Sequence, residues 1–153
     1  MKEKLEWTEA YSIHNKKIDQ QHQQLFNLCN QMQELQEEQE ELEKIKKTVV
    51  ALYEYVKTHF SYEQEYMASI HYPLLEPHIA LHEEIVHKMN EYMRHSSNMA
   101  ALVYKFKALV YEWATEHIMQ QDKEIDRFVQ KRQPAKAEAS AEEVEGVGEA
   151  PKK

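Results

Sequence analysis

Apolar residues recur every three or four positions over four stretches of the chain, which is the spacing of an amphipathic helix. The predicted helices cover about residues 19–38, 43–70, 77–94 and 98–119, and a shorter helical piece is expected to follow to about residue 131. The second helix has the clearest apolar face, which consists of Ile45, Val49, Leu52, Val56, Phe60, Met67 and Ile70. Four such helices with short connections predict an all-α fold, an antiparallel up-down-up-down four-helix bundle with a short C-terminal helix.

The first eighteen residues precede the first apolar stripe. They predict an extended N-terminal arm, residues 1–18, with Trp7 and Tyr11 as aromatic anchors. Asp19 follows the arm and is the expected N-cap of the first helix, because its side chain can accept a hydrogen bond from a free N–H of the first turn.

Helix-breaking residues mark the later boundaries. Segment 71–77 is a connector, since two prolines four positions apart can stop one helix and start the next. The turn between the first two helices is expected near 38–42, inside a charged stretch. Residues 133–153 are poor in apolar side chains and predict a disordered acidic tail behind a single domain, residues 1–132.

Composition narrows the class of protein. A chain of 153 residues makes one domain with a sizeable core. Its formal charge of −8 argues against nucleic acid as a partner. Cys29, the single cysteine, has no internal disulfide partner, and no apolar run has the length of a membrane span or a signal peptide. We therefore expect a cytoplasmic protein without membrane insertion, and a monomer.

Five histidines and two carboxylates fall on the apolar faces of the predicted helices. They are His22, His59, Glu63, His78, His82, His117 and Asp122. Pairs four residues apart lie one turn apart on the same face of a helix. Ionisable groups directed into a core are costly unless something there satisfies them, and a bound metal is the simplest explanation.

The number of ligands favours a pair of iron ions. Two octahedral ions present about twelve coordination positions. Two bridging carboxylates, a bridging oxygen and five imidazoles fill all but one of them. An imidazole-rich site suits iron better than calcium or magnesium, which prefer oxygen ligands. Zinc accepts the same ligand types, but it favours four per ion and would leave groups unused.

Two other metal motifs do not fit. His82 and His87 are separated by five positions, whereas a zinc-protease helix needs a separation of four. A ferritin-like di-iron site needs two ExxH pairs, and Glu84–His87 is a single one outside the cluster. His14, His71, His87 and His95 lack the context of the cluster, so we expect surface or structural roles for them.

Four segments carry a resemblance to a known family. The arm WTEAYSIHNKKIDQQH and the blocks HFSYEQEYM, PHIALH and WATEHIMQQD resemble the hemerythrin family in its bacterial single-domain form, over roughly residues 7–125. The resemblance implies that one iron is held by the three later histidines of the cluster, His78, His82 and His117. It implies that the other iron is held by His22 and His59, and that Glu63 and Asp122 bridge the two together with an oxo or hydroxo group.

The same resemblance implies an open position on the two-histidine iron and an apolar oxygen pocket, formed by Leu25, Phe60, Met67, Trp113 and Ile118. It implies reversible binding of dioxygen, for storage, delivery or sensing, by a protein that is not an enzyme. Alternatives are an oxidase or peroxidase-like activity at the same irons, and an interaction module that responds to oxygen or iron. The chain departs from the family at His14, where many bacterial members carry glycine.

A geometric prediction concerns His117 and Asp122. Residues five apart on a regular α-helix lie roughly 140° apart around its axis, so the two side chains would not face the same centre. We therefore predict non-α hydrogen bonding within residues 117–122, with a helix resuming towards residue 131. No Gly or Pro is present there to cause the distortion, so a bound metal is expected to hold it.

Overall fold

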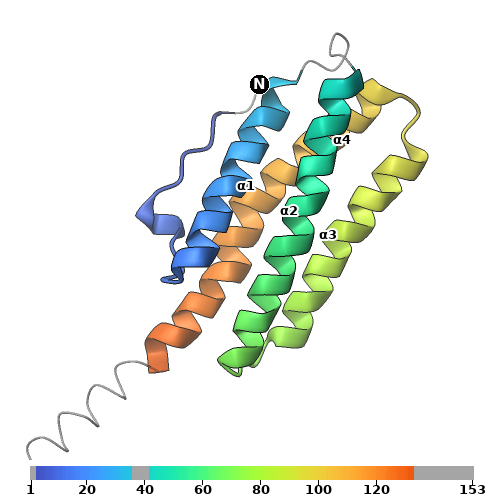
Figure 1. Ribbon diagram of the computed structural model, residues 1–153. Helices are drawn as coiled ribbons and strands as arrows, with labels where there is room; N and C mark the ends of the chain where they lie inside the picture. The colour runs from blue at the N-terminus through green and yellow to red at the C-terminus, as the bar shows by residue number, and fades with distance from the viewer. Residues whose placement is uncertain (1–2, 36–41, 133–153) are drawn as a thin grey trace, which may run out of the picture.

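The computed structural model describes residues 3–35 and 42–132 (Figure 1). In these ranges every regular element is helical, which confirms the predicted all-α class. The helices are α1 (Lys16–Glu34), α2 (Leu42–Ser69), α3 (Leu75–His95) and α4 (Met99–Glu112), with a short 3-10 turn, η1 (Glu9–Tyr11), before them. A π-helical segment, η2 (Trp113–Asp122), continues α4, and residues 123–132 return to α-helix.

The helices form a closed four-membered bundle. Each of α1, α2 and α3 packs against the next helix along the chain, and α1 also packs against α4 and η2. Figure 1 shows that the chain direction reverses at each connection, so the predicted up-down-up-down topology is confirmed. Among the described residues, no helix combines the length and the apolar content needed to span a membrane.

The interior is filled by the apolar stripes that the periodicity predicts. One continuous cluster of buried side chains runs through all four helices and includes Phe26, Leu52 and Phe106. Burying a side chain of this size contributes about 1.5–3 kcal/mol. A second, smaller cluster consists of Met67, Tyr72 and Ile125. It joins the end of α2 and the following connector to the helical turns beyond η2.

The arm packs along α1, and Trp7 and Tyr11 are the aromatic anchors that the sequence predicted. Trp7 and Tyr11 are partly buried against the main cluster, and the Tyr11 ring meets Phe26 edge-on at 4.8 Å between centroids. The backbone of Leu5 exchanges two hydrogen bonds of 2.8 Å with the Asn30 side chain on α1. The arm is therefore attached to the bundle at both its apolar and its polar positions.

The predicted N-cap is wrong. The first helix begins at Lys16, and its N-cap is Asn15, whose Oδ1 accepts from the backbone N–H of Ile18 at 3.1 Å. Asp19 lies inside the first turn instead. Its carboxylate accepts from the Ser12 hydroxyl at 2.6 Å and from the Ile13 N–H at 2.9 Å, so it fastens the arm rather than the helix end.

Other boundaries differ by a few residues. The first helix ends at Glu34, and the predicted turn at 38–42 lies largely outside the described residues, as does the tail at 133–153. The third helix begins at Leu75, two residues before Pro77. Pro77 fits there because N–H groups of the first helical turn have no partner within the helix.

Candidate metal centre

All seven residues of the predicted cluster converge in the interior of the bundle, towards the end at which α1 and α3 begin and α2 ends. His22 comes from α1, His59 and Glu63 from α2, His78 and His82 from α3, and His117 and Asp122 from η2. Glu63 and Asp122 are fully buried, and the five imidazoles are 0–9% exposed at their side chains.

The donor atoms form two overlapping groups. One consists of Glu63, His78, His82, His117 and Asp122, and the other of His22, His59, Glu63 and Asp122. Within each group one ligand atom from every residue lies within 4.8 Å of the others. Because both carboxylates belong to both groups, the arrangement is that of two adjacent cation sites that share Glu63 and Asp122.

His78 Nε2 and Glu63 Oε1 form a buried hydrogen bond of 2.8 Å, but most other polar atoms at the centre of the cluster approach one another without pairing. His59 Nε2 lies 3.2 Å from Glu63 Oε2, and His117 Nε2 lies 3.2 Å from Asp122 Oδ1, yet these four atoms make no hydrogen bond. The Nε2 atoms of His22 and His82 are also buried and unpaired. Such atoms are costly in a core unless something satisfies them. Five imidazoles and two carboxylates that converge in this way fit a pair of transition-metal ions.

The π-helical segment accounts for the placement of Asp122. In η2 the hydrogen bonds close over five residues, and the N–H of Lys123 donates to the Ile118 carbonyl. Residues five apart therefore come one turn apart, and His117 and Asp122 both reach the cluster. The predicted non-α bonding is confirmed, although it begins at Trp113, four residues earlier than expected.

In four residues of the cluster, burial and the neighbouring charges shift the pKa in opposite directions, and the neighbouring charges prevail. Burial alone would lower the pKa of His22 and His78, but the nearby carboxylates of Asp122 and Glu63 raise both to about 9. Burial would raise the pKa of the two carboxyls, and the surrounding imidazoles instead hold both below their usual range. The pKa of His82 is lowered, because burial outweighs its contact with Glu63.

Two glutamines contact the outer nitrogens of the imidazoles. Gln21 Oε1 lies 2.7 Å from His59 Nδ1, and Gln64 Nε2 lies 3.2 Å from His82 Nδ1. The sequence argument did not identify them. Both are next to residues of the cluster, since Gln21 directly precedes His22 and Gln64 directly follows Glu63, but this adjacency does not indicate the histidine that each one contacts.

Apolar and aromatic side chains enclose the cluster. The Phe60 ring stacks on His82 at 3.8 Å between centroids with an interplanar angle of 3°. Four of the five residues predicted as an oxygen pocket are buried in the main core cluster, namely Leu25, Phe60, Trp113 and Ile118. Met67 is buried in the second cluster. Their role around oxygen stays a prediction.

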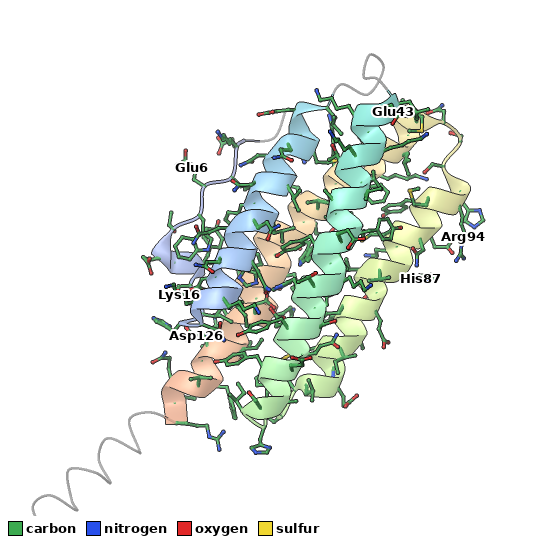
Figure 2. All side chains as sticks on the ribbon, in the orientation of Figure 1. Glu6, Lys16, Glu43, His87, Arg94 and Asp126 are labelled. Atoms are coloured by element: carbon green, nitrogen blue, oxygen red, sulfur yellow. The ribbon has the colours of Figure 1, made fainter. Side chains whose placement is uncertain are left out.

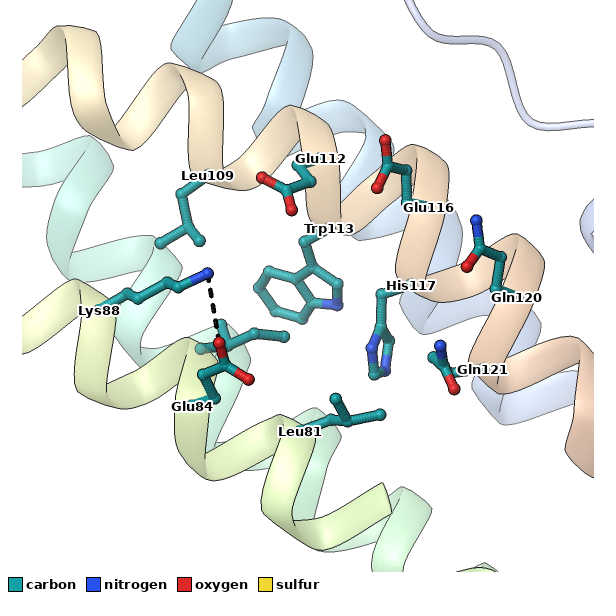
Figure 3. Close-up of a pocket in the computed structure, with 11 residues that line it drawn as sticks. Leu81, Glu84, Lys88, Leu109, Glu112, Trp113, Glu116, His117, Gln120 and Gln121 are labelled. Atoms are coloured by element: carbon teal, nitrogen blue, oxygen red, sulfur yellow. Dashed lines mark ion pairs between the residues drawn. The ribbon is translucent and has the colours of Figure 1, made fainter. Parts of the chain in front are cut away.

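A cleft of about 170 Å³ lies between α3 and the junction of α4 with η2 (Figure 3). Trp113 and His117 form its inner wall together with Leu81. Glu84 and Lys88 form an ion pair of 3.5 Å at its rim. His117 is the most exposed imidazole of the cluster, with 9% of its side chain accessible, so the cleft brings the cluster nearest to the surface.

The other histidines lie away from the cluster. His71, His87 and His95 are exposed, and His87 lies on α3 outside the bundle interior (Figure 2). His14 is also exposed and has a positive φ of 57°. Its Nδ1 lies 2.8 Å from Asp126 Oδ1. These positions agree with the surface or structural roles expected for the four histidines.

Comparison with known proteins points to one family. The profile described as the Hemerythrin HHE cation binding domain matches residues 14–128. A bacteriohemerythrin from Clostridium acetobutylicum is 29% identical over 123 residues, which cover 77% of this chain and 95% of the relative. A bacteriohemerythrin from Campylobacter jejuni is 21% identical over 122 residues, which cover 79% of this chain and 92% of the relative.

Fold and site together define a class, a four-helix bundle with a buried histidine–carboxylate cluster that could hold metal. The profile match extends over most of the chain and includes all seven residues of that cluster. This chain belongs to the hemerythrin family.

Proposed function

We propose that the protein binds dioxygen reversibly at a non-haem di-iron centre. His78, His82 and His117 would hold one iron, and His22 and His59 the other. Glu63 and Asp122 would bridge them together with an oxo or hydroxo group. The observation that carries the proposal is the pair of overlapping donor groups that share these two carboxylates.

The composition of the cluster supports a carrier more than an oxygen-activating enzyme. Iron bound here would supply the electrons that dioxygen takes up on binding. Neutral imidazoles donate less charge to a metal than carboxylates do, so five imidazoles give little support to the high oxidation states that attack substrates. The family profile and the two bacteriohemerythrins also favour oxygen binding without catalysis.

The surroundings of the cluster support reversibility. Phe60 and Trp113 are 6% and 3% exposed, and Leu25 and Ile118 are fully buried. Apolar walls limit the entry of water and protons. Fewer protons at the site would slow the loss of bound oxygen as peroxide, which is the reaction that oxidises a carrier irreversibly.

The test is an oxygen cycle followed by absorption. The protein is loaded with two ferrous ions per chain without oxygen, exposed to oxygen, and then returned to an oxygen-free atmosphere. We expect the original spectrum to return through several cycles. Failure to recover it would refute reversible binding, and steady consumption of oxygen with an added reductant, faster than autoxidation, would support an oxidase instead.

A further inference from the structure

Gln21 is not among the predicted metal ligands, yet its side chain lies against one of them. It is 8% exposed, and its Oε1 lies 2.7 Å from His59 Nδ1. Gln21 belongs to α1 and His59 to α2, so this contact crosses between two helices at the level of the cluster. On α1 it is adjacent to His22, which reaches the same donor group.

The contact determines which nitrogen of His59 carries the proton. An amide oxygen can accept a hydrogen bond but cannot donate one, so Nδ1 of His59 must be the donor. A neutral imidazole has one N–H, and the lone pair is then on Nε2. Nε2 of His59 is buried without a hydrogen-bond partner and lies 3.2 Å from Glu63 Oε2. Gln21 therefore directs this lone pair into the cluster.

Tyr55 holds both members of this pair in place. Its hydroxyl donates a hydrogen bond of 2.7 Å to the backbone carbonyl of Gln21. Its ring stacks on the His59 ring, with 5.3 Å between centroids and an interplanar angle of 16°. Tyr55 is 5% exposed, so its contacts with Gln21 and His59 are sheltered from exchange with water.

The contact behind His82 has the opposite direction, because Gln64 approaches Nδ1 with its amide nitrogen, which donates a hydrogen bond and cannot accept one. Gln64 is only partly buried, and its amide lies 3.2 Å from His82 Nδ1. Gln64 and His82 both line an open pocket between α2 and α3, so water can replace the amide there. The two glutamines therefore differ in how firmly each fixes its histidine.

We propose that Gln21 is a positioning residue that sets the tautomer of His59, and thereby the affinity of the metal site formed by His22 and His59. The inference rests on the di-iron centre proposed above. A hydrogen-bonded partner behind a metal-binding histidine fixes its tautomer and its orientation, and its removal weakens metal binding by about 10–100-fold.

The experiment compares four proteins, namely wild type, Gln21→Met, Gln21→Glu and Gln24→Met. Methionine matches glutamine in size but has no comparable acceptor, whereas glutamate keeps one. Gln24 is exposed on the same helix and is the matched control. Each protein is titrated with ferrous iron under nitrogen in competition with a chelator. We expect Gln21→Met to bind one of its two ions about 10–100-fold more weakly, and Gln21→Glu and Gln24→Met to keep both affinities.

A spectroscopic measurement separates positioning from general loss of structure. In zinc-loaded protein, proton NMR should show a slowly exchanging Nδ1–H of His59 in the wild type and in Gln21→Glu. The signal should be lost in Gln21→Met while the thermal unfolding curve of the helical signal stays cooperative. If Gln21→Met does not fold, Gln21→Asn can replace it, because its side chain is shorter by one methylene and withdraws the acceptor. This variant should bind the same one of the two ions more weakly.

The inference would be overturned if Gln21→Met bound both ions with wild-type affinity, or if Gln24→Met lost as much affinity as Gln21→Met. The titration measures iron and not oxygen, so the two proposals fail in different ways. A wild-type protein that binds two ferrous ions but does not release oxygen refutes the proposed function and leaves the role of Gln21 to be judged on the titration alone.

Discussion

Replacing Glu63 with glutamine keeps the shape of the side chain and removes one negative charge from the centre of the cluster. The carboxylate is fully buried, and imidazole nitrogens of His22, His59, His78 and His82 lie within 3.7 Å of it. Glu65→Gln is the matched control, since Glu65 is exposed on the same helix. The substitution should have two separable effects, one on the metal-free protein and one on metal binding.

The first effect follows from the pKa of two histidines. His22 and His78 have pKa values of about 9 in the folded protein, against 6.5 for an unperturbed histidine. At about 1.4 kcal/mol per pKa unit, the carboxylates stabilise each imidazolium by roughly 3 kcal/mol. Glu63 and Asp122 share this stabilisation, so Glu63→Gln should lower the free energy of unfolding of metal-free protein by about 3 kcal/mol near pH 7, which agrees with the usual cost of breaking a buried ion pair.

The second effect concerns the ions. Glu63 belongs to both donor groups, so bound iron should fall from about two per chain towards none. An ion present at a thousand times its dissociation constant stabilises the fold by about 4 kcal/mol, and this gain should vanish in Glu63→Gln. Metal analysis and urea unfolding with and without chelator measure both effects. A Glu63→Gln protein with two irons and wild-type stability would refute the assignment of Glu63 as the shared bridge.

Three further outcomes are expected. His82→Ala should lose the iron of the three-histidine group, while His87→Ala on the outer face of α3 should keep both, as judged by metal analysis. Metal-free protein should lose stability as the pH rises, because the stabilisation from protonated His22 and His78 is complete below pH 6.5 and is lost as the pH rises through about 9. Denaturant unfolding at pH 6.5 and 9.5 measures the change, and a constant free energy of unfolding would contradict it. Asp126→Asn should lower the free energy of unfolding by about 1 kcal/mol and speed amide hydrogen exchange at residues 113–126. Unchanged exchange would show that the contacts of Asp126 do not hold this segment.

Periodicity was sufficient to predict the helices and the cluster. The spacing of apolar residues depends on local geometry, and so does the placement of His59 and Glu63 one turn apart on α2. The same local reasoning showed that His117 and Asp122 need a distorted helix to meet. It could not place the start of the distortion at Trp113, because that depends on how the whole segment packs against α1 and α3.

The misplaced N-cap has a similar cause. Asn15 and Asp19 are both good capping residues, and local sequence does not choose between them. The choice depends on the arm, whose Ser12 hydroxyl and Ile13 N–H occupy the Asp19 carboxylate. Gln21 was missed for a comparable reason, since its role appears only when α2 brings His59 to it.

The arm also bears on the geometry of the cluster. Ser12 donates to Asp19 at 2.6 Å near the start of α1. The backbone carbonyl of the same Ser12 accepts from Lys123 Nζ at 2.7 Å, directly after Asp122. The arm thus connects the helix that carries His22 to the segment that carries Asp122, and His22 Nε2 lies 3.0 Å from Asp122 Oδ2.

His14 completes this connection. It adopts a left-handed backbone conformation, with φ at 57°, which glycine accepts most readily and histidine tolerates better than most residues. A glycine would relieve the backbone but could not reach Asp126, whose Oδ1 lies 2.8 Å from His14 Nδ1. The contact and the Lys123–Asp126 pair, at 3.3 Å, hold the helical turn that follows η2. His14 therefore exchanges backbone freedom for a side-chain contact, and the contact holds the turn next to Asp122 from outside the cluster.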